Sequence, residues 1–74
     1  MTQNEMIINH LREYGSITQL EALREYGCMR LASRISDLRK TGIKIIRLTE
    51  TSRNRYGQKI RYARYIMEGN ENAE

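Results

Sequence analysis

The sequence predicts an α+β fold, in which three helices are followed by a C-terminal β-hairpin. Apolar residues recur at helical spacing as far as Gly42 and at about every second position after it. Glycines follow each expected helix, at Gly15, Gly27 and Gly42. Beyond Gly42, two segments rich in β-branched and aromatic residues flank a polar, basic stretch, which is typical of a hairpin.

The first helix is expected over about residues 2–14. Thr2 and Glu5 have the spacing of a capping box, in which each side chain satisfies a backbone N–H at the helix start. An apolar stripe at helical spacing is formed by Ile7, Leu11 and Tyr14. Gly15 then offers the left-handed conformation that ends many helices.

The second helix is expected over residues 19–26, between a second capping box and Gly27. Thr18 and Glu21 form this capping box. Two residues are expected to face inward, Leu20 and Leu23, and one hydrophobic staple is expected, between Ile17 and Ala22.

The third helix is expected over about residues 29–41, directly after the turn at Gly27. Its core face is expected to hold Leu31, Ile35 and Leu38, flanked by Ala32. Its opposite face carries Met29, Arg30, Ser33, Asp37 and Lys40, with Arg34 at the edge. Two helices joined by a tight glycine turn, the second of them basic outside, are typical of a helix-turn-helix.

The hairpin is expected to pair residues 43–50 with residues 59–67 around a loop over residues 51–58. Three helices followed by a hairpin form the winged helix-turn-helix arrangement, with the hairpin as the wing. From residue 68 the chain is polar and acidic. We therefore expect one domain over residues 1–67 and a flexible acidic tail over residues 68–74.

Charge is distributed very unevenly along the chain. The net charge is +4, but residues 28–64 hold eleven of the thirteen Lys and Arg residues against Asp37 and Glu50, which gives that segment +9. Such a basic block indicates a polyanionic partner, and a solvated charged surface is the alternative. The fold must decide between them.

Size and residue types argue against several classes of protein. A chain of 74 residues is one small domain with little room for a deep pocket, and no catalytic set or phosphate loop is apparent. We expect no enzyme, no cofactor and no metal site, since His10 and Cys28 are the only soft ligands. A lone cysteine and the lack of a signal-peptide or membrane-spanning pattern favour a cytoplasmic protein.

Two groups of side chains are candidates for contact with double-stranded DNA. On the third helix they are Met29, Arg30, Ser33, Arg34 and Asp37, for which the alternative is a surface ion pair between Arg34 and Asp37. At the helix end and the wing they are Lys40, Lys44, Arg53, Asn54, Arg55, Gln58, Lys59 and Arg61. A solubilising loop is the alternative for the wing.

The stretches "RLASRISDLRK" and "RYGQKIRYARY" resemble a family of small winged helix-turn-helix proteins common in bacteriophages and prophages. The resemblance covers about residues 4–67 and implies a DNA-binding fold. It does not imply a defined regulatory role. Our leading hypothesis is a sequence-preferring regulator of a phage or mobile element, which binds as a monomer or as a homodimer on DNA. The alternatives are a module that binds a host protein and a replication or packaging accessory with little sequence preference.

Overall fold

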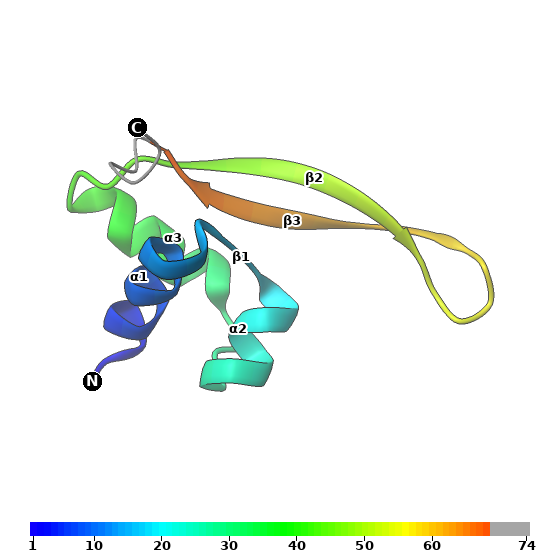
Figure 1. Ribbon diagram of the computed structural model, residues 1–74, viewed down its shortest axis with the longest axis horizontal. Helices are drawn as coiled ribbons and strands as arrows, with labels where there is room; N and C mark the ends of the chain where they lie inside the picture. Colours follow the sequence, from blue (N-terminus) through cyan, green and yellow to red (C-terminus); the bar gives the residue numbers. More distant parts are fainter. Residues whose placement is uncertain (69–74) are drawn as a thin grey trace.

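The described residues form three helices and three strands, in the order α1, β1, α2, α3, β2 and β3, and the predicted α+β winged helix-turn-helix is confirmed. The computed structural model describes residues 1–68, so the expected tail lies outside this range except for Glu68. In Figure 1 the helices lie below the sheet and the β2–β3 hairpin projects well beyond them. The elements are α1 Gln3–Tyr14, β1 Ser16–Thr18, α2 Gln19–Tyr26, α3 Leu31–Lys40, β2 Ile45–Arg53 and β3 Lys59–Met67.

Local sequence determines where the first two helices begin and end. Both predicted capping boxes are confirmed, with Thr2 and Glu5 at the start of α1 and Thr18 and Glu21 at the start of α2. Gly27 ends α2 with a φ of 66°, a left-handed conformation that costs glycine little. The two helices therefore end close to the predicted residues.

The sheet contains one strand that the sequence did not predict. Its order is β1-β3-β2, with all pairs antiparallel. The short β1 pairs Ser16 with Ile66 and Thr18 with Arg64. Only Ile17 within it is apolar, so its extended conformation depends on hydrogen bonds from β3 and not on a local pattern.

The hairpin is longer, and its loop shorter, than the sequence predicted. Nine antiparallel pairs run from Ile45 and Met67 at the base to Arg53 and Lys59 at the tip. The loop is residues 54–58, because residues 51–53 continue β2. β2 begins two residues late, since the N–H of Ile43 still donates to the carbonyl of Leu38 at the end of α3.

The core joins α1, β1, α3 and the base of the hairpin. Its largest fully buried side chains are Ile7, Leu11, Ile17, Cys28, Leu31 and Ile35. The predicted staple is consistent with the burial of Ile17 and Ala22. The inward placement of Leu20 and Leu23 was wrong, because both are exposed and α2 buries little besides Ala22. Tyr14, the last residue of the predicted apolar stripe, is exposed as well.

None of the helices within residues 1–68 is long and apolar enough to cross a membrane.

Candidate nucleic-acid interface

The predicted start of the third helix at residue 29 was wrong, since α3 begins at Leu31. The side chain of Gln19 spans the turn: its Nε2 donates to the carbonyl of Cys28 at 2.7 Å, and its Oε1 accepts from the N–H of Leu31 at 2.9 Å. Cys28 is fully buried as well. Gln19 thus satisfies a first-turn donor of α3 and holds Met29 and Arg30 outside the helix.

Replacing Gln19 with alanine should loosen the start of α3. The change leaves the Cys28 carbonyl and the Leu31 N–H without protein partners, and we expect a loss of about 1–2 kcal/mol in the free energy of unfolding. Urea denaturation measures this loss, and amide exchange at Leu31 locates it. Gln58→Ala, at the wing tip, is the matched control and should cost less than about 0.5 kcal/mol. Equal stability of both variants would contradict this role.

The start of α3 presents candidate side chains to solvent. Met29 is 76% exposed, and Arg30 is the N-cap residue without a side-chain capping bond. Farther along, an exposed stripe at helical spacing is formed by Ala32, Ser36 and Lys40. Ala32 was expected beside the core, and Ser36 was not among the candidates. Ala32 and Ser36 precede Lys40 by eight and four residues, and this helical spacing could have indicated from the sequence that they share its exposed face.

Arg34 and Asp37 lie together on one flank of α3 and are half-buried. An Nη2 of Arg34 is 3.4 Å from Asp37 Oδ2, which also accepts a long hydrogen bond, 3.5 Å, from Asn4 of α1. The surface ion pair considered above is thus present. It engages both side chains beside α1, whereas Ser33 is half-buried next to them.

At the junction between α3 and β2, one arginine is structural and two lysines are exposed. Arg39 donates from Nε and Nη2 to the carbonyl of Ile45, at 3.0 and 2.8 Å. This bifurcated contact connects the helix end to the edge strand. Lys40 and Lys44 are exposed and form no ion pair within residues 1–68.

Asn54 organises the loop at the wing tip. Its Oδ1 accepts from the N–H groups of Tyr56 and Gln58, at 2.9 and 3.0 Å, and its Nδ2 donates to Gln58 Oε1 at 3.0 Å. Gly57 has a φ of 79°, as this tight turn requires. The two candidate amides, Asn54 and Gln58, therefore bond to each other, and Arg55 is left exposed at the tip.

The strand register gathers the remaining wing candidates on one side of the hairpin. Side chains of directly paired residues share a face, and faces alternate along each strand. The pairs Arg53–Lys59 and Thr51–Arg61 therefore lie on the same side as Arg47. We call this side the basic face, formed by Arg47, Arg53, Lys59 and Arg61. Arg47 was not among the candidates, although its alternation with Arg53 was visible in the sequence.

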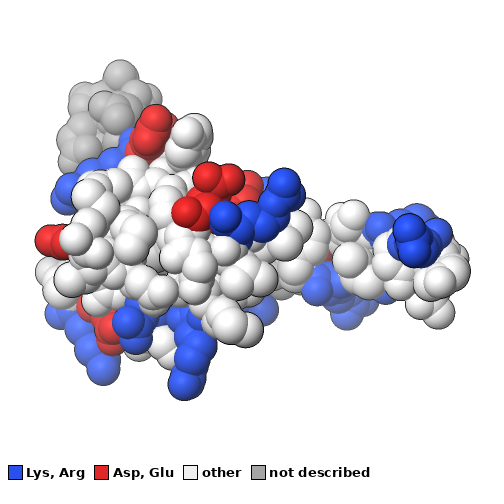
Figure 2. Space-filling model, turned by 90° about the horizontal axis from the view of Figure 1, so that it is seen from below, with Lys and Arg blue, Asp and Glu red and all other residues white. Residues whose placement is uncertain are grey.

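Basic side chains are concentrated in parts of the surface. In Figure 2, Lys and Arg side chains gather along the lower edge of the helical body and on the projecting hairpin. The largest acidic group in this view lies nearer the middle of the body. The uneven charge along the sequence therefore becomes an uneven charge over the surface.

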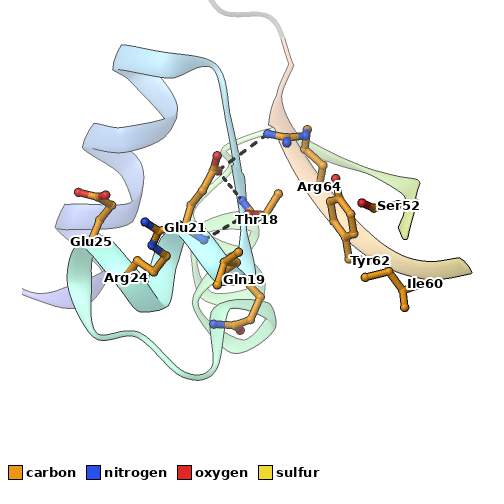
Figure 3. A pocket seen from close by; sticks show the side chains of 10 residues that line it. Thr18, Gln19, Glu21, Arg24, Glu25, Ser52, Ile60, Tyr62 and Arg64 are labelled. Atoms are coloured by element: carbon orange, nitrogen blue, oxygen red, sulfur yellow. Dashed lines mark hydrogen bonds and ion pairs between the residues drawn. The ribbon is translucent and has the colours of Figure 1, made fainter. Parts of the chain in front are cut away.

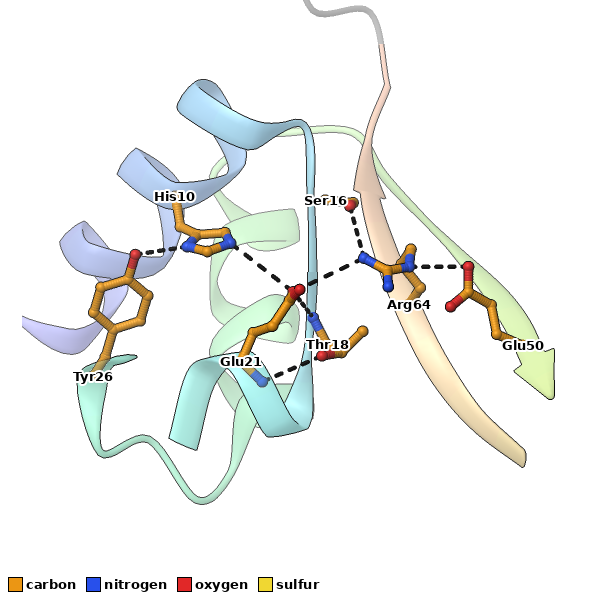
Figure 4. Close-up of polar contacts among 7 residues, drawn as sticks. All are labelled: His10, Ser16, Thr18, Glu21, Tyr26, Glu50 and Arg64. Atoms are coloured by element: carbon orange, nitrogen blue, oxygen red, sulfur yellow. Dashed lines mark hydrogen bonds and ion pairs between the residues drawn. The ribbon is translucent and has the colours of Figure 1, made fainter. Parts of the chain in front are cut away.

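A chain of polar contacts attaches the hairpin to the helices (Figure 4). Arg64 of β3 contacts Glu50 of β2 at 2.9 Å, Ser16 of β1 at 3.0 Å and Glu21 of α2 at 3.9 Å. The Arg64 guanidinium holds the pKa of Glu50 below its ordinary value of 4.5. Because these contacts join three strands and α2, they set the direction in which the wing leaves the body.

Glu21 continues this chain toward α1. Its Oε1 accepts from the Thr18 N–H at 2.9 Å and lies 4.0 Å from Nε2 of the buried His10. The Nδ1 of His10 is 2.6 Å from the hydroxyl oxygen of Tyr26. His10 is thus buried within a polar network.

Within residues 1–68, no three His, Cys, Asp or Glu side chains are grouped so that they could hold a metal ion. The structural features of the interface are instead a half-exposed helix after a tight turn and a basic, projecting hairpin.

Comparison with known families agrees with this architecture. The family model described as a winged helix-turn-helix domain matches residues 2–69, nearly the whole chain. Searches of curated proteins and of solved structures gave no match. Winged helix-turn-helix domains are DNA-binding modules. The fold, the helix-turn-helix and the wing, together with this match, establish that the chain belongs to the winged helix-turn-helix domain family.

Proposed function

We propose that this chain binds double-stranded DNA with sequence preference, with α3 in the major groove and the wing on the flanking backbone or minor groove. The observation that carries the proposal is the availability of its cations. Of the eleven Lys and Arg residues between positions 28 and 64, only Arg34 and Arg64 form ion pairs within the described part of the chain. Arg39 is held by the carbonyl of Ile45, and the other eight are exposed and remain available to a polyanion.

The N-terminal end of α3 is the element that reads bases. Residues at the start of a recognition helix reach the base edges first. Arg30, exposed and without an ion pair among residues 1–68, suits a bidentate contact with guanine, and Met29 suits a thymine methyl group. Ser33 and Ser36 lie about one turn farther along, where hydroxyl groups contact bases or phosphates. Asp37 orients the guanidinium group of Arg34 through their ion pair.

The wing supplies contacts with the backbone. Arg55 lies at the tip of the hairpin, and the basic face runs along it. The hairpin itself projects beyond the helical body (Figure 2). Guanidinium and ammonium groups at this position suit phosphates or a narrow minor groove. Asn54 and Gln58 support these contacts by holding the loop, and Lys40 and Lys44 add positive charge at the end of α3.

The biological setting that we propose is a transcriptional regulator of a phage or mobile element, acting in the bacterial cytoplasm. This part rests on the resemblance of residues 4–67 to small phage and prophage proteins. The choice between activation and repression depends on the position of the DNA site, which the chain does not encode.

Selection from a random duplex library at physiological salt tests the proposal. A sequence preference is expected, and Arg30→Ala should relax it at one base position with a loss of about 1–3 kcal/mol in binding free energy. Lys40→Ala should weaken binding to all sequences alike. Binding without an enriched sequence would favour a non-specific accessory. No duplex binding at low salt would overturn the proposal and favour a host-protein partner.

A further inference from the structure

The hairpin has a second face that DNA binding leaves unused. By the register, the side opposite the basic face carries Ile46, Leu48, Ile60 and Tyr62, and we call it the apolar face. Each of these four side chains is exposed. The same side also holds Ser52 and the ion pair between Glu50 and Arg64. A two-stranded hairpin without cover is marginal in water. Because β1 pairs only with residues 64–66 of β3, the outer half of this hairpin has no third strand.

The apolar face borders a groove that α2 closes on its other side (Figure 3). The groove is open and encloses about 620 Å³. Its apolar lining is Leu20 from α2, which is 60% exposed, together with Ile60 and Tyr62 from β3, at 42% and 39%. Single exposed apolar residues are ordinary, whereas these three are gathered in one groove.

The charges of this groove indicate the kind of partner. Its lining includes two acidic residues, Glu21 and Glu25, and two arginines, Arg24 and Arg64. The groove is therefore close to neutral, although the segment from residue 28 to residue 64 has a charge of +9. A nucleic acid or a strongly basic protein would gain little electrostatic binding energy from a groove whose positive and negative charges are equal in number.

A second copy of the same chain fits these charges. In a two-fold interface each surface meets its own copy, so the surface must be complementary to itself. Arg24 and Glu25 lie next to each other on α2, and neither forms an ion pair within residues 1–68. A two-fold axis that passes close to these two residues allows Arg24 of each copy to face Glu25 of the other.

We propose that two copies of this chain associate through the groove, burying Leu20, Ile60 and Tyr62 and pairing Arg24 with Glu25 reciprocally. The basic and apolar faces lie on opposite sides of the hairpin, so a dimer leaves the basic face free. Only the consequence for DNA rests on the proposed function: a two-fold pair presents two copies of α3 to symmetric half-sites.

Sedimentation velocity over a concentration series tests the interface without DNA. The unmodified chain should dimerise as concentration rises. Leu20→Gln combined with Ile60→Thr should raise the dimer dissociation constant by about tenfold or more, since both changes keep the local secondary-structure preference. Tyr14→Gln is the matched control, because Tyr14 is exposed but does not line the groove. It should leave the dissociation constant unchanged.

A charge exchange gives an independent measurement. Arg24→Glu should weaken the dimer by placing like charges across the axis, and adding Glu25→Arg should restore it. A monomer at every concentration, or no response to the groove variants, would overturn the interface. The groove variant should bind a single half-site duplex as the unmodified chain does. Failure of the interface thus differs from failure of DNA binding, which would abolish half-site binding in both proteins.

Discussion

Raising the salt concentration from about 50 to 200 mM should lower the affinity of this chain for duplex DNA by about a thousandfold. Each phosphate contact releases condensed counterions from the DNA, so the logarithm of the binding constant falls linearly with that of the salt concentration. About six phosphate contacts correspond to a slope of about −5. The exposed cations of α3, the α3–β2 junction and the wing are numerous enough for such a footprint.

The position of the cations, and not their number alone, should set this slope. Arg53→Ala combined with Arg55→Ala removes two charges from the wing and should make the slope shallower by about two. Arg12→Ala removes a charge from α1, outside the proposed interface, and should leave the slope unchanged. Fluorescence anisotropy with a labelled duplex measures all three proteins. An equal change per removed charge from α1 and from the wing would contradict a localised interface.

Leu11→Ala should destabilise the chain by about 2–5 kcal/mol, enough to unfold much of a domain this small. Leu11 is 0% exposed and lies in the core of α1. Its truncation removes buried methyl groups and leaves a cavity that the surrounding side chains fill only in part. Thermal or urea unfolding, followed by circular dichroism, measures the change.

Leu20→Ala is the matched control for this substitution. The chemical change is the same, but Leu20 is 60% exposed on α2. The loss should be less than about 0.5 kcal/mol at a concentration where the chain is monomeric. Similar losses at the two positions would mean that α2 packs as the sequence predicted and not as the structure places it.

The ends of α1 and α2 were predictable because the signals that specify them are local. A threonine followed three residues later by glutamate closes a capping box within one turn, whatever lies elsewhere in the chain. The same is true of Gly27, whose left-handed conformation is a property of that residue alone. The change of period after Gly42 likewise predicted the hairpin, because alternation is a property of consecutive residues.

Several features of the candidate interface depend on residues far apart in the sequence. The true start of α3 is set by Gln19, twelve residues before Leu31. Arg34 and Asp37 lie beside Asn4 of α1, thirty-three residues from Asp37. No periodicity links such positions, so their proximity becomes visible only when the helices pack together. The same holds for the apolar groove, where Leu20 faces β3.

The sequence by itself determined the order of elements, the limits of α1 and α2, and the concentration of positive charge in the second half of the chain. The pair between Arg34 and Asp37 was visible within the third helix. Only the tertiary structure showed that Arg64 and Arg39 are engaged as well, because their partners come from other elements. It also divided the hairpin into a basic and an apolar face. Strand register sets that division, and register depends on how two distant segments align.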